Sequence, residues 1–302
     1  MSGSEYLERL KQTLADVIGV LRAKGIQERH LAFGGEGPVP TKRITVPTDA
    51  RSEFLANRAM GDWAEQVMAQ ALSRTFPDWK IVPYGFTDRI AAGHPEFKVR
   101  YLAGLNEVRK SGKRPDLLIF SAETAVPDDL SEAAQAEIET TVRHAVAAVE
   151  VRSSKFEALK YMAVRKEQRE AGKVTGRSAP SFTVKVEDLV IVYRWLERHR
   201  VPQTYCQVFF DSLFAINFLD IFATIGSGKG FTMEKPAKSQ EKATLMIPIT
   251  RGRQIGTATA MPTFTAAHRV TKLGRHDAYV VPQGGGFELD AKATRRVLLA
   301  EG

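Results

Sequence analysis

Three acidic residues stand in surroundings where an acid is unusual, and together they could bind a metal ion. Asp116 begins the apolar run DLLIFSA directly after Pro115, Glu150 interrupts the apolar run AAVEV, and Glu65 lies in GDWAEQ. A carboxylate inside a buried strand costs free energy unless it is paired or bound to a metal. Two such carboxylates on neighbouring strands would offer the oxygen ligands that Mg²⁺ prefers.

A base follows Glu150 on the same predicted strand. Arg152 is two residues further on, so both side chains point to one face. A metal ion beside a fixed cation suits phosphate chemistry, because both neutralise the charge that grows on a reacting phosphate. Structural alternatives exist for each residue. Asp116 could cap a turn, Glu150 and Arg152 could form a cross-strand ion pair, and Glu65 alone reads as an exposed helix acid.

Positive charge is the second chemical signal of the sequence. The chain has 302 residues and a formal net charge of +8. Lys and Arg gather in four clusters, namely KSGKR (110–114), RKEQREAGKVTGR (165–177), RWLERHR (194–200) and TRGR (250–253). Any one cluster reads as a solvated face, but four in a basic chain favour a nucleic-acid partner.

The elements that must position these residues are predicted from apolar periodicity and turn residues. Helices are predicted at 5–24, from about 50 to 75, from 155 to about 171, in the second half of 207–224 and in 290–302. Strands are predicted at 79–86, at 116–122, within 142–154, at the start of 207–224 and as a hairpin in 243–260. This order predicts an α/β or α+β fold with a mixed central β-sheet flanked by helices.

Several other kinds of site are excluded by the sequence. The only cysteine is Cys206, and the six histidines are scattered, so neither a disulfide framework nor a zinc site is expected. GSGKG (226–230) lacks the spacing of a phosphate-binding loop. With no signal-peptide segment and no membrane-spanning run, we expect a cytoplasmic protein without a membrane partner.

The acidic motifs also resemble a known signature. Pro115-Asp116 followed by Glu150-Val151-Arg152 resembles the PD-(D/E)xK nuclease signature, with arginine in the place of lysine. GDWAEQ resembles the accessory acidic helix of that fold, and EVRSSKF with its basic helix is similar to type II restriction endonucleases. SFTVKVEDLVIVYRWLERHRVPQ and QVFFDSLFAINFLDIF are similar to the XcyI/AccI-like group. The resemblance covers about residues 50 to 255.

The resemblance implies a restriction-endonuclease-like core and the roles of its residues. It implies five catalytic residues, Asp116, Glu150, Arg152, Lys155 and Glu65. Asp116, Glu150 and the main-chain carbonyl of Val151 would bind Mg²⁺. Arg152 would hold the water or the phosphate, because arginine stays protonated and cannot act as a base. Lys155 is the substitute if the role of the lysine has moved along the chain, although it also reads as the first turn of a helix.

The resemblance further implies hydrolysis of double-stranded DNA at a short palindromic site, leaving 5′-phosphates. CCCGGG and GTMKAC are the two candidate targets. A palindrome implies a homodimer, because two-fold protein symmetry matches two-fold DNA symmetry. The candidate DNA contacts are Arg165, Lys166, Arg169, Arg251 and Arg253, which would bind phosphates or read base edges.

We expect one endonuclease domain over 1–302 in a bacterial cytoplasm. It would comprise an N-terminal helical extension (1–45), a catalytic core (50–225) and a β-rich C-terminal part (226–302). Because arginine replaces the lysine, two alternatives stay open. One is a non-catalytic, sequence-specific DNA-binding protein on a nuclease-like scaffold, and the other is a repair or junction nuclease.

Overall fold

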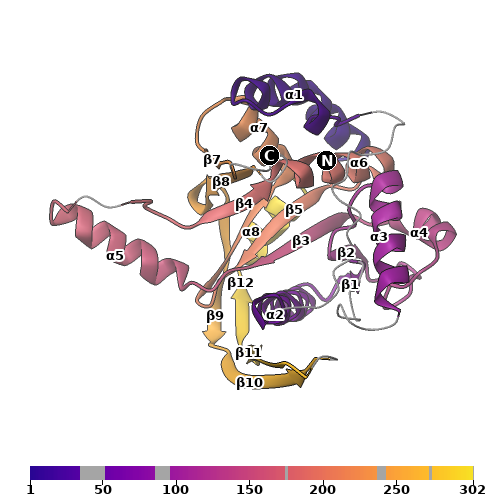
Figure 1. The fold of residues 1–302 in the computed structure, drawn as a ribbon. Coiled ribbons are helices and arrows are strands. Elements are labelled where there is room, and N and C mark those ends of the chain that lie inside the picture. The colour runs from indigo at the N-terminus through magenta and orange to yellow at the C-terminus, as the bar shows by residue number, and fades with distance from the viewer. Residues whose placement is uncertain (35–51, 86–95, 174–175, 237–242, 272–273, 302) are drawn as a thin grey trace.

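A mixed seven-stranded β-sheet forms the centre of the molecule, with helices on both of its faces (Figure 1). The computed structural model describes residues 1–34, 52–85, 96–173, 176–236, 243–271 and 274–301. This architecture confirms the predicted fold class. The predicted boundary between the N-terminal extension and the core, at 45–50, lies outside the described residues.

The central sheet has the order β1-β2-β3-β5-β6-β9-β12. β3 and β5 pair in parallel, and every other neighbouring pair is antiparallel. The strands are β1 (Trp79–Pro83), β2 (Leu117–Ser121), β3 (Ala147–Ser153), β5 (Gln203–Val208), β6 (Ser212–Asn217), β9 (Arg253–Ala260) and β12 (Gly286–Leu289). The last two strands come from the C-terminal part of the chain, so that part completes the central sheet.

Two hydrophobic cores lie on opposite faces of this sheet. Helices α1 (Gly3–Ala23), α6 (Val186–His199) and α7 (Phe218–Gly226) pack on one face, and α2 (Ser52–Thr75) and α8 (Ala291–Leu298) on the other. Along β3, Ala148 belongs to the first core, whereas Val149 and Val151 belong to the second. Since side chains alternate along a strand, Glu150 and Arg152 point to the side of α6.

The remaining elements surround this framework. The helices are α3 (Phe97–Ser111), α4 (Gln135–Val142), α5 (Ala158–Glu170) and two short 3₁₀ turns, Glu28–His30 and Ile249–Arg251. The strands are β4 (Ser181–Lys185), β7 (Thr232–Glu234), β8 (Thr244–Pro248), β10 (Thr263–Val270) and β11 (His276–Gln283). None of the described helices combines the length and the apolar character needed to cross a membrane.

The predicted hairpin in 243–260 is wrong in its pairing. Both strands form, but β8 pairs with β4 and β7, whereas β9 pairs with β6 and β12. A 3₁₀ turn separates the two strands. At Gly252 a Cβ atom would lie 2.3 Å from the carbonyl oxygen of Ala215, so the glycine lets the chain enter the central sheet against β6.

Candidate active site

The pairing of β2 with β3 brings two acids from distant parts of the sequence together. Leu117 pairs with Val149, so the residue before Leu117 stands beside the residue after Val149. These residues are Asp116 and Glu150. The main-chain N–H of Val151 donates a hydrogen bond of 2.6 Å to Oδ2 of Asp116, which ties the two strands together at this point.

Asp116 is also fixed through its main chain. Its carbonyl oxygen accepts hydrogen bonds from the main-chain N–H groups of Tyr84 and Gly85, at 2.9 and 3.1 Å. A Cβ atom at Gly85 would lie 3.2 Å from Oδ1 of Asp116, so glycine leaves room next to this oxygen. The carboxylate therefore has one oxygen anchored by Val151 and one beside Gly85, and Asp116 and Gly85 both line an open cleft.

Glu150 is the most buried member of the site, with 1% of its side chain exposed. Its Oε1 receives two cations, Nη2 of Arg152 at 2.9 Å and Nζ of Lys113. Its Oε2 is buried and has no hydrogen-bond partner among the described residues. A buried carboxylate oxygen without a partner is costly, so Oε2 fits a cation that the described side chains do not supply.

Arg152 is held from three sides. Besides Glu150, Nη2 of Arg152 contacts Oδ2 of Asp188 at 3.1 Å, and the guanidinium lies 6.0 Å from the centre of the Tyr205 ring. Burial and the charge of Glu150 raise the pKa of Tyr205, so this ring stays neutral. The Glu150–Arg152 ion pair considered from the sequence is therefore present, within a larger cluster of charges.

The acids act on one another electrostatically. Burial, and after it the negative charges of Asp62 and Glu150, raise the pKa of Glu65 to about 7. Burial and the charge of Glu150 raise the pKa of Asp116 well above its usual range. Glu65 on α2 is therefore near enough to be influenced by the charge of Glu150, and a cation would relieve the repulsion among these carboxylates.

The carboxylate oxygens of Asp116 and Glu150 are the candidate ligands for a metal ion. Within the described ranges, no three His, Cys, Asp or Glu side chains converge as a metal-binding group. The site is thus a pair of carboxylates with one oxygen beside Gly85 and one unpaired oxygen. This fits Mg²⁺, which usually binds one or two carboxylates and keeps waters or substrate phosphates as its other ligands. Val151 contacts Asp116 through its main-chain N–H. Metal binding by the carbonyl of Val151 stays a prediction.

Lys155 lies apart from the acids. It is exposed in the loop after β3 and lines an open cleft with Phe156, Tyr161 and Arg165. None of the contacts recorded for the described residues links Lys155 to the carboxylates. The structure therefore does not bring this lysine to the acidic pair, because the chain leaves the sheet at Ser153 and turns into α5.

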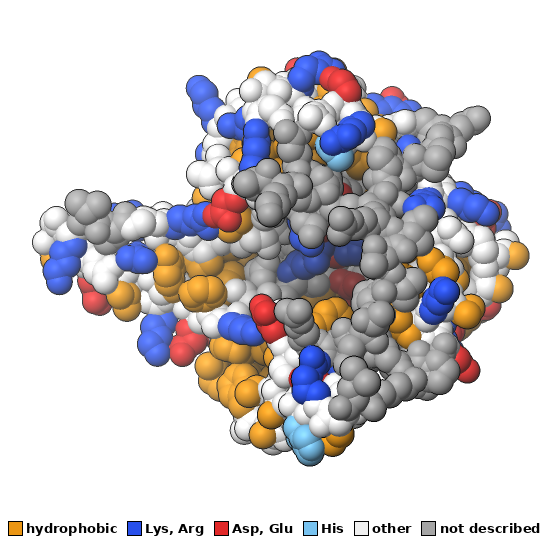
Figure 2. All heavy atoms as spheres, in the orientation of Figure 1, with side chains coloured by type: hydrophobic (Ala, Val, Ile, Leu, Met, Phe, Trp, Pro, Cys, Tyr) orange, Lys and Arg blue, Asp and Glu red, His pale blue; other side chains and the backbone are white. Residues whose placement is uncertain are grey.

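The predicted basic helix, α5, projects from the body of the protein (Figure 1). Ala158 is its only buried residue. Arg165 is held over the Tyr161 ring at 5.1 Å, and Lys166 and Arg169 are exposed. In Figure 2, Lys and Arg side chains are spread along this arm, while basic and acidic side chains lie together in a hollow near the middle of the face shown.

The other two candidate DNA contacts lie elsewhere. Arg253 lines a cleft with Arg9, Asp220 and Arg296, and Arg251 lies against the main chain at Gly230. In the part of the chain that the structure describes, neither arginine has a recorded contact with the acidic pair.

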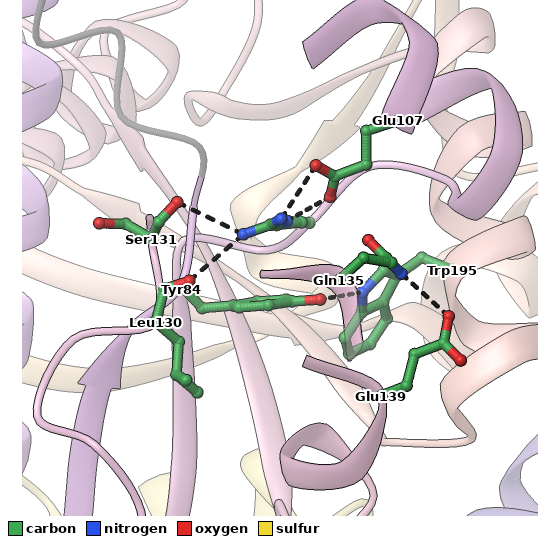
Figure 3. Close-up of polar contacts among 8 residues, drawn as sticks. Tyr84, Glu107, Leu130, Ser131, Gln135, Glu139 and Trp195 are labelled. Atoms are coloured by element: carbon green, nitrogen blue, oxygen red, sulfur yellow. Dashed lines mark hydrogen bonds and ion pairs between the residues drawn. The ribbon is translucent and has the colours of Figure 1, made fainter. Parts of the chain in front are cut away.

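Sequence reasoning missed the contacts of Lys113 and Asp188 with the site. It also missed the buried contacts that hold the chain directly before and around the Pro-Asp motif. Arg114 is buried, and its Nη2 donates to Oε2 of Glu107 at 2.9 Å. Its guanidinium lies 5.1 Å from the centre of the Tyr84 ring. The hydroxyl of Tyr84 accepts a hydrogen bond of 3.2 Å from Nε1 of Trp195 (Figure 3). In the sequence, only their position could have pointed to Lys113 and Arg114, since they directly precede the Pro-Asp motif in KSGKRPD.

Comparison with known proteins assigns the chain to a family. A family model described as AccI restriction endonuclease matches residues 32–173 and 162–301. No curated protein and no solved structure matches the chain. The two matched ranges overlap and cover nearly all of the chain, including both strands that carry the acids. The chain belongs to the AccI restriction endonuclease family and is a type II site-specific deoxyribonuclease, a hydrolase that acts on DNA.

Proposed function

We propose that the protein is a Mg²⁺-dependent endonuclease that cuts both strands of DNA at a short palindromic site and leaves 5′-phosphates. The observation that carries this proposal is the acidic pair formed by Asp116, directly before β2, and Glu150 on β3. Oε2 of Glu150 is buried without a partner among the described residues, next to Asp116, whose Oδ2 is anchored by Val151. Carboxylates kept in this state suit a divalent cation.

Asp116 and Glu150 would hold Mg²⁺, with Glu65 as a nearby third acid. When bound there, the ion would lower the pKa of a bound water and neutralise charge on the phosphate. Arg152 would keep Glu150 in place through its contacts with Glu150 and Asp188. Asp116 would be kept in place by its main-chain and side-chain hydrogen bonds.

A homodimer follows from the proposed target. One copy of the chain offers one acidic pair, and cutting both strands of a palindrome requires two equivalent sites related by two-fold symmetry. CCCGGG and GTMKAC are the targets to test first.

The proposal is tested by digesting phage DNA with the purified protein, in Mg²⁺ and in EDTA, and sequencing the ends. We expect discrete fragments with 5′-phosphates in Mg²⁺ and intact DNA in EDTA. Sequencing the ends gives the target and the position of the cut. Discrete fragments in EDTA, or a smear without preferred ends in Mg²⁺, would contradict the proposal.

A further inference from the structure

Two cations meet at the same oxygen of Glu150, but their surroundings differ. Arg152 is committed to the protein, because Nη2 also contacts Asp188 at 3.1 Å and the guanidinium faces the Tyr205 ring. Lys113 has Glu150 as its only ion-pair partner among the described residues. Arg152 is thus fixed by several contacts, whereas Lys113 is held through one ion pair among the described residues.

Lys113 also faces open space beside the acids. A cleft of 230 Å³ between α3 and the start of β2 is lined by Lys113 and Asp116, together with Gly85 and Gly104. The Lys113 side chain is 28% exposed. In the described part of the chain, Arg152 is not among the residues that line this cleft. A group that enters the cleft beside Asp116 therefore meets Lys113 and not Arg152.

The main chain around Lys113 is fixed tightly enough to position that ammonium. Gly112 has φ +82°, and a Cβ atom there would lie 2.4 Å from both Ile191 O and Trp195 N, so only glycine fits. The N–H of Lys113 donates to Ile191 O at 3.0 Å. On its other side, Arg114 is anchored by Glu107 (Figure 3). The turn is therefore docked on α6 and α3.

We propose that Lys113, from the turn before β2, is the catalytic cation of this enzyme, and that Arg152 is a positioning residue that clamps Glu150. Lys113 would contact a non-bridging oxygen of the scissile phosphate in the cleft. The assignment rests on the proposed function. Water forms the new oxygen–phosphorus bond, the bond from phosphorus to the 3′ oxygen breaks, and the proton that water loses balances the one that this oxygen gains. Lys113 keeps its own proton throughout.

The test compares Lys113→Gln with Lys110→Gln, a control in the same basic cluster, KSGKR, whose side chain is exposed at the end of α3. Loss of one preorganised donor at the reacting phosphate costs about 100-fold or more in rate. We therefore expect Lys113→Gln to cut phage DNA at least about 100-fold more slowly under single-turnover conditions. Its DNA affinity in Ca²⁺ and its melting temperature should stay close to those of the control.

Chemical rescue separates a catalytic role from a structural one. Cys206, the only native cysteine, is buried, so Lys113→Cys gives one accessible thiol in the folded protein. Alkylation with 2-bromoethylamine rebuilds an ammonium of nearly lysine length, and we expect it to restore most of the lost rate. Lys113→Gln cutting within about threefold of the unaltered enzyme would overturn the assignment. So would an alkylated Lys113→Cys that is folded, binds DNA and stays inactive. Failure of the unaltered enzyme to cut any DNA in Mg²⁺ would instead overturn the proposed function, and the role of Lys113 with it.

Discussion

The two acids at the centre of the proposed site differ in how their carboxylate oxygens are held. Asp116 has an oxygen beside Gly85, and Glu150 has an oxygen buried without a partner among the described residues. Because each would supply an oxygen to the metal, neither should replace the other.

Neutralising either acid should stop catalysis but not DNA binding. We expect Asp116→Asn and Glu150→Gln each to cut at least about 1,000-fold more slowly, since a bound metal contributes several kcal/mol to the stabilisation of charge in the transition state. Gel shifts in Ca²⁺ should show DNA affinity within a few-fold of the unaltered protein. Glu137→Gln, an exposed acid on α4, is the control. An acid variant that cuts at the rate of this control is not a metal ligand.

Arg152→Lys should retain measurable activity. Lysine keeps the charge beside Glu150 but loses the guanidinium nitrogen Nη2, which contacts both Glu150 and Asp188, so we expect about a tenfold loss of rate. Single-turnover cleavage and thermal melting measure the two consequences separately. Complete inactivity in a folded variant that binds DNA would show that the guanidinium itself is required.

At the scale of elements, the acids, the turn before β2 and α5 are set by contacts far apart in the sequence. The first turn of α5 has no cap from its own N-terminal residues. Asp211, which follows β5, instead accepts hydrogen bonds from the N–H groups of Ala158 at 2.7 Å and Leu159 at 2.8 Å. An acid at a helix N-terminus satisfies free N–H groups and interacts favourably with the helix dipole. Because α5 buries only Ala158, we expect these hydrogen bonds from its first turn to Asp211 to contribute much of the attachment of α5 to the central sheet.

Asp211→Ala should loosen α5 while leaving the acidic pair in place. We expect a loss of about 1 kcal/mol in local stability. Hydrogen exchange should therefore accelerate at residues 158–162, measured by mass spectrometry. Asp290→Ala, which removes the cap of α8, is the matched control and should affect residues 291–298 instead. Unchanged exchange in α5 would show that the loop before it, and not the cap, holds the helix.

At the end of α6, His199 should make folding stability depend on pH. His199 lies against Trp195, and burial, followed by the charge of Arg198, lowers its pKa from 6.5 to about 4. As pH falls from 6.5 towards 4, the unfolded chain takes up a proton that the folded chain refuses, so folding stability is lost across that window. With its partial exposure taken into account, we expect this loss to be about 2 kcal/mol. His199→Gln should flatten the profile measured by urea unfolding, and an unchanged profile would assign the acid sensitivity to other groups.

At the scale of the whole molecule, the candidate DNA contacts divide between α5 and the chain at the start of β9. Replacing Arg165, Lys166 and Arg169 by Gln should lower the slope of log affinity against log salt by about 2 to 3, since each phosphate contact contributes about 0.9. The Arg251→Gln, Arg253→Gln variant is the control, because both residues lie away from the acidic pair. Fluorescence anisotropy in Ca²⁺ measures the slopes. A larger change in the control would place the DNA across β9 rather than along α5.

The sequence by itself determined several elements of the fold and the two acids of the candidate site. The strands that carry Asp116 and Glu150, the helix with Glu65 and the basic helix were predicted close to their observed bounds, because each has its own apolar periodicity or charge run. The two acids were recognisable because an acid in an apolar run is costly at any position in a fold. α3 was not predicted, since it buries only Phe97 and Ser111 and so carries little periodicity.

Only the tertiary structure decided which cation meets the acids. Lys155 is closer in sequence to Glu150 than Lys113, yet Lys113 makes the contact, because Gly112 lets the turn before β2 dock on α6. The same holds for β8 and β9, which are neighbours in sequence and members of different sheets. Periodicity and composition report the environment of a residue along its own segment. Partners across the fold depend on packing between segments, which no local pattern contains.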